Sequence, residues 1–268
     1  MAVESAKRTS AVISSRPEAR LEAITIYVLA VVFVATLIRS AFGFGEALVA
    51  VPLLALRLPI EIAAPLAVLV SITVAAVIVV QDWHKIHLRS SGWLVLATLF
   101  GIPLGLLLLT HGNQRGVKAS LGAIMVAFSA WALIGRRPPE LHSDSRIWLL
   151  VCGFLAGVLG GAYGMNGPPL AIYGGMRRWS AQHFRATLQA YFLPASVIGM
   201  AGYWAAHLWT WPVTRYYLFS LPLVVPAILL GRVINHRMRG ETFLKYVHVG
   251  LLVIGAVLMA QAISHSHL

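Results

Sequence analysis

Charged residues are scarce in this chain. They make up 11% of its 268 residues, whereas a soluble globular domain usually carries about 25%, and 59% of the residues are hydrophobic. A chain of this composition cannot cover its surface with polar groups in water. A lipid bilayer removes that requirement, because the surface that faces lipid has to be apolar. We therefore expect an integral membrane protein rather than a soluble domain.

Acidic residues are the scarcer of the two signs. Only 9 of them oppose 21 basic residues, which leaves a formal net charge of +12. The basic residues stand before the first apolar run and in the gaps between runs, for example Arg136 with Arg137 and Arg177 with Arg178. Basic residues at such places contact lipid headgroups and set the topology of membrane segments. We expect membrane lipids as neighbours and no nucleic-acid partner.

The sequence also lacks the usual signs of a disulfide, a metal centre or a bound cofactor. A single cysteine, Cys152, excludes an intrachain disulfide. The histidine pairs His84 with His87 and His265 with His267 have no cysteine or acidic partner at ligand spacing. No P-loop, HExxH pair or Gly-x-Ser-x-Gly motif occurs. We expect no cofactor, no metal and no enzyme, and a polar amino-terminal tail without the features of a signal peptide.

Long apolar runs are what the sequence has in abundance. Crossing about 30 Å of hydrocarbon takes roughly 20 helical residues. Runs of about that length lie at 24–41, 61–81, 92–110, 117–135, 147–162, 184–208, 214–233 and 243–263. Two shorter apolar stretches, 46–58 and 168–176, follow glycine-rich breaks and fit half-helices or re-entrant segments better than full spans. The pattern predicts an all-α integral membrane protein with eight spans and two short segments.

The chain repeats itself at an offset of about 121 residues. The stretch AFGFGE from Ala41 corresponds to AYGMNG from Ala162, and Pro103 corresponds to Pro226. We interpret this as two homologous halves of about four spans, each with a glycine-rich broken or re-entrant segment. The predicted divisions are a polar tail, a first repeat, a polar linker, a second repeat and a C-terminal tail: 1–23, 24–135, 136–146, 147–263 and 264–268. Duplicated halves with matching broken segments are typical of secondary transporters, whose site lies near the midplane between two moving bundles.

The basic residues bear only weakly on orientation. With eight spans, the amino-terminal tail, Lys85 and Arg136 share one side, which the positive-inside rule makes cytoplasmic. Arg237 then falls on the other side. The rule favours eight spans over ten and leaves the orientation open.

The glycine-rich breaks are the most informative positions. An unpaired backbone amide in hydrocarbon costs several kcal/mol, so a helix breaks only where protein or a watery cavity covers the break. Glycines that permit such breaks occur in both halves: Gly43, Gly45, Gly164 and Gly167. In the second half Asn166 can cap a new helix, and Pro168 is tolerated in its first turn. The free N–H groups of two such half-helices could converge on one anion, or the glycines could only tighten helix packing.

Charged and polar residues inside the apolar runs are costly to bury and usually functional. Arg39 precedes the first break and Arg185 opens the sixth run. A guanidinium near helix amino termini binds an oxyanion bidentately, although both side chains could instead extend to the headgroups. Glu46 follows the first break and is either a proton carrier or a structural partner of Arg39. Gln189 and Tyr191 either add neutral hydrogen bonds to the same site or face neighbouring helices.

Two stretches of the chain resemble a known family. RSAFGFGEALVAVPLLAL from Arg39 and GGAYGMNGPPLAIYGGMRRWSAQHFRATLQAYFL from Gly160 are similar to the two glycine-rich signatures of the TauE/SafE family of bacterial membrane permeases. The resemblance extends over about residues 24–263. It implies a multi-pass transporter of the bacterial inner membrane for small anions, often sulfur-containing ones such as sulfite, sulfonates or sulfoacetate. By matched position it implicates Gly43, Gly45, Gly164, Asn166, Gly167, Pro168 and Arg185 in the site.

Glu46 departs from the family pattern, which more usually continues with glycine at that position. A carboxylate so close to an anion site repels the substrate unless it is protonated or paired with Arg39, and this makes proton coupling attractive. We therefore expect a secondary transporter that couples protons to a small sulfur-containing or carboxylate anion. The alternatives are a membrane-embedded enzyme, a cation or metal permease, and a passive channel. The oligomeric state stays open, a homo-oligomer included.

Overall fold

The computed structural model describes residues 2–82, 88–135, 140–141, 146–178, 181–237 and 240–264. Within these ranges the side chains of residues 2–20, 42, 81–82, 88–91, 181–186, 189, 235–237, 240–247 and 264 lie outside the description. The described residues form α-helices and no strand: α1 (Ala2–Phe42), α2 (Glu46–Ala55), α3 (Ile60–Asp82), α4 (Leu88–His111), α5 (Gln114–Ile134), α6 (Arg146–Tyr163), α7 (Gly167–Met176), α8 (Ala181–Ala205), α9 (Trp211–Arg237) and α10 (Gly240–Ser264).

Most of the long helices can cross a membrane. Over the described residues, six segments are long and apolar enough: Leu21–Ala41, Ile60–Val80, Gly92–His111, Gln114–Ile134, Arg146–Tyr163 and Trp211–Ile234. Helices α8 and α10 have 25 residues each, and parts of both lie outside the described side chains. The all-helical membrane fold is confirmed. The count of eight spans and the division into tails, linker and two halves stay predictions.

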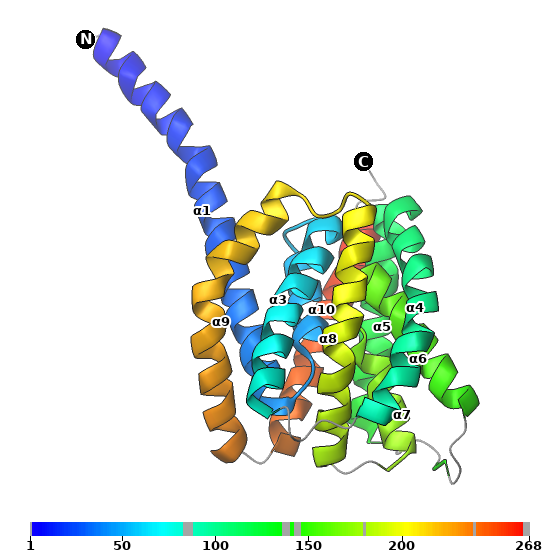
Figure 1. The fold of residues 1–268 in the computed structure, drawn as a ribbon. Helices are drawn as coiled ribbons and strands as arrows, with labels where there is room; N and C mark the ends of the chain where they lie inside the picture. Colours follow the sequence, from blue (N-terminus) through cyan, green and yellow to red (C-terminus); the bar gives the residue numbers. More distant parts are fainter. Residues whose placement is uncertain are drawn as a thin grey trace.

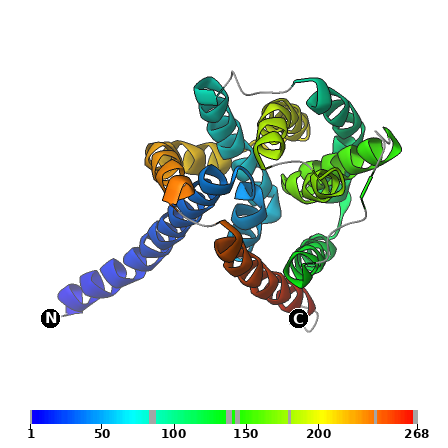
Figure 2. The same cartoon turned by 90° about the horizontal axis from the view of Figure 1, so that it is seen from below.

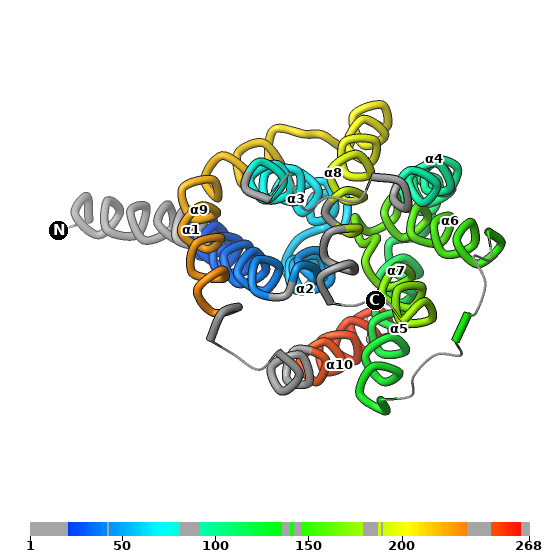
Figure 3. The backbone as a smooth tube through the Cα atoms, turned by 60° about the horizontal axis from the view of Figure 1, so that its bottom comes forward, coloured from blue at the N-terminus to red at the C-terminus, as the bar shows by residue number. Residues whose placement is uncertain are grey.

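The short helices α2 and α7 lie inside the bundle. Each has 10 residues and is therefore about 15 Å long, half the thickness of the hydrocarbon layer. The longer helices surround them (Figures 1 and 3). Seen along the bundle, α9 packs against α1 and α10 packs against α5 (Figure 2).

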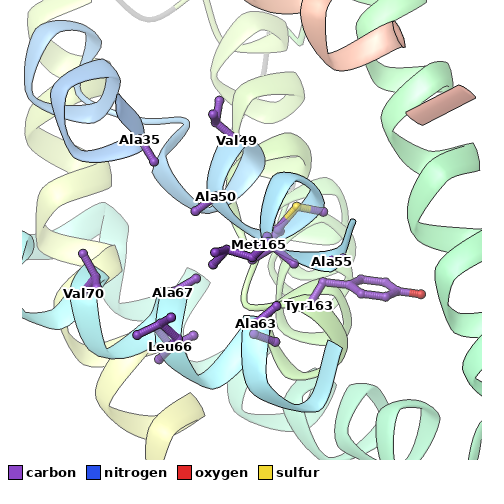
Figure 4. Close-up of a cluster of buried hydrophobic side chains, with 14 of the residues drawn as sticks. Ala35, Val49, Ala50, Ala55, Ala63, Leu66, Ala67, Val70, Tyr163 and Met165 are labelled. Carbon is purple, nitrogen blue, oxygen red and sulfur yellow. The ribbon is translucent and has the colours of Figure 1, made fainter. Parts of the chain in front are cut away.

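Small buried side chains of α2 and α3 form the core between these two helices and the segment that precedes α7. Met165, from the segment before α7, lies among Ala50 of α2 and Ala63 of α3, and all three are buried (Figure 4). Alanines leave room for backbones to approach closely where no lipid or water can satisfy a gap. This packing holds the starts of α2 and α7 next to each other.

Helix α2 reverses the direction of the chain. The Tyr27 hydroxyl of α1 donates to the Leu53 carbonyl of α2 at 2.5 Å, and Arg39 near the end of α1 binds Glu46 at the start of α2. Arg39 also donates to Ser71 in the middle of α3. Helix α2 thus runs back along α1, and α3 runs back along α2, parallel to α1. This differs from eight alternating spans, in which the runs 24–41 and 61–81 would have opposite directions.

Helices α4 and α6 touch along glycines. A Cβ atom on Gly101 would lie 2.2 Å from the Phe154 carbonyl oxygen, and a Cβ on Gly105 would lie 2.1 Å from that of Val158. The contact advances by one turn on both helices together, so α4 and α6 run in the same direction. Two glycines of α6 make equally close contacts from the other side: Gly157 and Gly161. We call this contact the glycine seam.

The seam generates a stability prediction. A Cβ on Gly157 would lie 2.3 Å from the Thr98 carbonyl oxygen, and backbone cannot rotate aside. We expect Gly157→Ala to destabilise the protein by about 1–3 kcal/mol, the usual cost of overpacking, and to lower the midpoint of thermal unfolding in detergent by several degrees. Gly199→Ala is the control, since a Cβ there meets nothing within 4 Å. Equal midpoints for the two variants would contradict the seam.

Candidate functional site

The first break separates α1 from α2. Gly43 (φ 84°) and Gly45 (φ 97°) adopt the left-handed backbone conformation, which is costly for residues with a side chain. The Gly43 N–H donates to the Arg39 carbonyl at 2.6 Å and closes the last turn of α1. The first backbone bond of α2 runs from the Val49 N–H to the Gly45 carbonyl at 3.1 Å. The amides that precede Val49 in α2 therefore have no acceptor within the helix, and they form a donor end.

The second break separates α6 from α7. Gly164 (φ 67°) turns the chain beside α3, and a Cβ on Gly160 would lie 2.5 Å from the Asn166 side-chain oxygen. Asn166 precedes α7 with a helical backbone, and its side chain makes no capping bond. Its amide nitrogen donates instead to the Tyr191 hydroxyl at 3.3 Å. The expectation that the Asn166 side chain caps α7 is wrong, because α8 holds this amide.

Prolines reduce the number of backbone N–H groups that the start of α7 can offer as hydrogen-bond donors. Pro168 and Pro169 occupy its first turn, as the sequence predicted. Neither residue has an N–H group, so α7 presents fewer donors than α2. The positive end of the α7 dipole still points toward the break. Backbone hydrogen bonds to an anion would therefore come mainly from α2.

A small cavity lies where the two breaks meet. Its walls come from α1, both breaks, the first turns of α2 and α7, and the helices α3 and α8: Arg39, Phe44, Gly45, Glu46, Ala47, Leu48, Ser71, Gly164, Met165, Asn166, Gly167, Pro168, Phe192 and Ser196. Its water-accessible volume is about 30 Å³. One water molecule needs about 10–15 Å³, so the space takes about two waters. A larger occupant requires the walls to part.

A buried ion pair forms one wall of this cavity. The Nη1 atom of Arg39 donates to Oε2 of Glu46 at 2.5 Å and to Oγ of Ser71 at 2.5 Å. Both charged side chains are only 2% exposed. The guanidinium lies over the Phe192 ring, 5.0 Å from its centroid. Contact with the ring and the carboxylate compensates part of the cost of burying the arginine.

The ion pair leaves hydrogen-bonding capacity unused. Nε and Nη2 of Arg39, and Oε1 of Glu46, have no hydrogen-bond partner among the described residues. Buried polar atoms normally have a partner, and exceptions call for an explanation such as an unseen water or ion. The Nε and Nη2 atoms form one edge of the guanidinium, which is the geometry that binds carboxylate and sulfonate oxygens in pairs. We call these two atoms the free edge of Arg39.

A chain of hydrogen bonds fixes the Asn166 side chain. The Thr98 hydroxyl donates to the Gly153 carbonyl at 2.9 Å and lies 2.7 Å from the Tyr191 hydroxyl. Because the Thr98 hydrogen is used on Gly153, the Tyr191 hydroxyl donates to Thr98 and accepts from the Asn166 amide nitrogen. The Asn166 oxygen consequently points away from Tyr191. Tyr191 is thus a second layer behind the cavity wall.

Most of the residues that the sequence singled out lie together. Those that line the cavity are Arg39, Gly45, Glu46, Gly164, Asn166, Gly167 and Pro168. Gly43 lies one step behind, at the end of α1, and Tyr191 contacts the wall through Asn166. Arg185 and Gln189 are on α8, but their side chains lie outside the described part of the chain.

The sequence reasoning missed some of the lining residues. Phe192 and Ser196 come from α8 and lie seven residues after Arg185 and Gln189 respectively, on the same face of the helix. That helical spacing could have identified them. Ser71 is one of the few polar residues in the apolar run 61–81. It is buried, and its hydroxyl oxygen accepts a hydrogen bond from Arg39.

Comparison with known proteins gives one result. The family model described as Sulfite exporter TauE/SafE matches residues 28–259, which is most of the 268-residue chain and includes both breaks. No curated protein and no solved structure matches the chain. The match covers every residue that lines the cavity. This multi-pass membrane protein therefore belongs to the TauE/SafE family of transporters.

Proposed function

We propose that the chain is a secondary transporter of the bacterial inner membrane that moves a small anion together with protons. The anion is a sulfur-containing one, such as sulfite, a sulfonate or sulfoacetate, or another organic carboxylate. One observation carries this proposal. The free edge of Arg39 is buried in a cavity at which two half-helices begin.

The electrostatics of the cavity favour an anion. The amino-terminal ends of α2 and α7 each place a partial positive charge of about half an elementary charge toward it. Ala47 and Leu48, in the first turn of α2, line the cavity and bring amides without helical acceptors. Arg39 adds a full charge, which Glu46 offsets. An oxyanion fits these donors better than a cation does.

Pairwise helix contacts support an internal repeat. The main contacts pair α1 with α9 and α4 with α6, and also α3 with α8 and α5 with α10. Replacing every helix by the one five places away exchanges the first two pairs and leaves the last two unchanged. Gly122 of α5 meets Gly255 of α10, and Phe128 meets His248, so α5 and α10 are antiparallel. Such an exchange is what an inverted repeat produces, and inverted repeats underlie alternating access.

Glu46 is the proposed proton carrier. It is buried beside Arg39 at the cavity wall, and one of its oxygens has no partner among the described residues. A buried carboxylate beside a binding site for anions competes with the substrate unless it takes up a proton. Proton binding to Glu46 would therefore remove the negative charge that repels the substrate from Arg39.

Transport itself is tested with purified protein in liposomes. We expect uptake of radiolabelled sulfite, sulfoacetate or an alkyl sulfonate, driven by an inward proton gradient. The double variant Arg39→Gln with Glu46→Gln removes both charges, which avoids leaving a buried carboxylate unpaired at a cost of about 3–5 kcal/mol. Loss of the guanidinium contact, worth about 1.5–3 kcal/mol, predicts uptake at least 10-fold lower. Arg57→Gln, at an exposed arginine outside the cavity, is the control and keeps normal uptake.

Arg185 gives a separate prediction. It lies on α8, two turns before the cavity residue Phe192. If its guanidinium contributes to the anion site, Arg185→Ala abolishes uptake at normal expression in the same liposomes. Unchanged uptake would remove Arg185 from the mechanism while leaving the cavity as the site.

The hydrogen-bond chain behind Asn166 predicts a milder effect. Tyr191→Phe removes the hydroxyl that orients the Asn166 amide, and one hydrogen bond is worth about 1 kcal/mol. We expect an apparent KM for the anion about 5-fold higher, with little change in expression. Tyr163→Phe is the control, because its hydroxyl contacts Ser120 and the Val117 carbonyl, away from the cavity. Equal KM values in the two variants would show that Tyr191 acts only on stability.

A further inference from the structure

The ion pair uses only part of the arginine. Glu46 contacts Arg39 through a single pair of atoms, Nη1 and Oε2, whereas a carboxylate that binds a guanidinium fully engages two nitrogens. Nε and Nη2 have no hydrogen-bond partner in the described part of the chain. An anion can therefore reach Arg39 at its free edge without first breaking the contact to Glu46. Once the cavity walls part, Glu46 and an anion can bind different nitrogens of the same guanidinium.

Charge balance decides what such a site can hold. Counting the described side chains, the empty site contains one cation and one anion, Arg39 and Glu46, and is neutral. Adding a singly charged anion to it would leave a buried net negative charge, which is costly far from water. Protonation of Glu46 restores neutrality. The loaded site then has the same net charge as the empty one.

Among the described residues that line the cavity, only Arg39 and Glu46 are charged. Helices α3 and α8 face it with the uncharged Ser71, Phe192 and Ser196, and the start of α7 has no ionisable residue. Arg232 of α9 is exposed, and His248 of α10 packs against the Phe128 ring, 5.6 Å away, outside the cavity wall. Arg185 on α8 has its side chain outside the described residues. If the positive charge of Arg185 contributed to the site, the site would prefer a doubly charged anion over a singly charged one. The uptake of sulfoacetate, which carries two charges, tests this.

We propose that this transporter is an electroneutral symporter of one proton and one singly charged anion. The anion takes the free edge of Arg39, and Glu46 takes up the proton. This inference rests on the proposed transport function and adds its stoichiometry, its charge selectivity and its independence of membrane voltage. Both the empty and the loaded site cross between the two faces without net charge.

The test uses the full-length protein in liposomes, with the membrane potential set by potassium and valinomycin. The probes are a radiolabelled alkyl sulfonate, which carries one charge, and sulfoacetate, which carries two at neutral pH. We expect proton-driven uptake of the alkyl sulfonate to be the same at potentials of about 100 mV of either sign. If one net charge moved per cycle, accumulation would change roughly 50-fold for every 100 mV of difference in potential. We expect the uptake of sulfoacetate to be at least 10-fold slower than that of the alkyl sulfonate.

A variant isolates the role of the carboxylate. Glu46→Gln keeps a hydrogen-bond acceptor for Arg39 and cannot exchange a proton. We expect this variant to transport the alkyl sulfonate without response to the proton gradient and to become sensitive to the membrane potential. Glu61→Gln is the matched control, because Glu61 lies at the start of α3, outside the cavity. Among the described residues, the hydrogen-bond partner of its side chain is Gln114, at 3.3 Å. The control keeps proton-driven, voltage-independent uptake.

Each outcome has a separate meaning. No flux of any probe with folded protein would overturn the proposed transport function. Flux that depends on voltage in the wild-type protein, or proton coupling that persists in Glu46→Gln, would overturn the electroneutral mechanism and leave transport standing. Preference for sulfoacetate would overturn the selectivity for single charge and indicate a second cation in the loaded site. The wild-type measurement decides the question even if the variant does not fold.

Discussion

Satisfaction of backbone polar groups is the constraint on which the rest of this structure depends. A helix cannot break in hydrocarbon unless protein encloses the break, because lipid offers its amides no acceptor. Protein covers both breaks of this chain: Gly164 packs against Val68 and Ala64 of α3, and the half-buried Gly45 lines the same cavity. That enclosure brings Gly45 and Gly164 to one place. The cavity is therefore a direct result of the two interruptions, between α1 and α2 and between α6 and α7.

The buried ion pair is the second feature that this enclosure makes tenable. A lone arginine or a lone glutamate at 2% exposure would be too costly, and the two together are still not a stabilising feature relative to apolar residues. Their presence beside the starts of α2 and α7 fits the function proposed for them better than a stabilising role. Ser71 and Phe192 then serve to hold the guanidinium in position.

The helices could be predicted from the sequence because hydrophobic run length is a local property, and the breaks could be predicted because glycine and proline act locally. The partners across the fold could not. Nothing in the run 61–81 shows that Ser71 meets Arg39, and hydropathy does not reveal that α2 turns the chain back. The hydrogen bond between Asn166 and Tyr191 could not be predicted for the same reason, since the two residues come from different helices.

The glycine seam has a mechanical consequence. It joins α4 and α6, which lie on opposite sides of residues 136–146 in the sequence, at backbone-to-backbone distance. Gly231 of α9 also approaches α1 closely, since a Cβ there would lie 2.7 Å from the Leu37 carbonyl oxygen. Close backbone packing over several turns leaves α4 and α6 little freedom to move relative to each other. The rigid units of this protein are therefore interlocked across the linker, and they do not coincide with the first and second parts of the chain. A cut in the linker would leave the assembled molecule held together by helix packing alone.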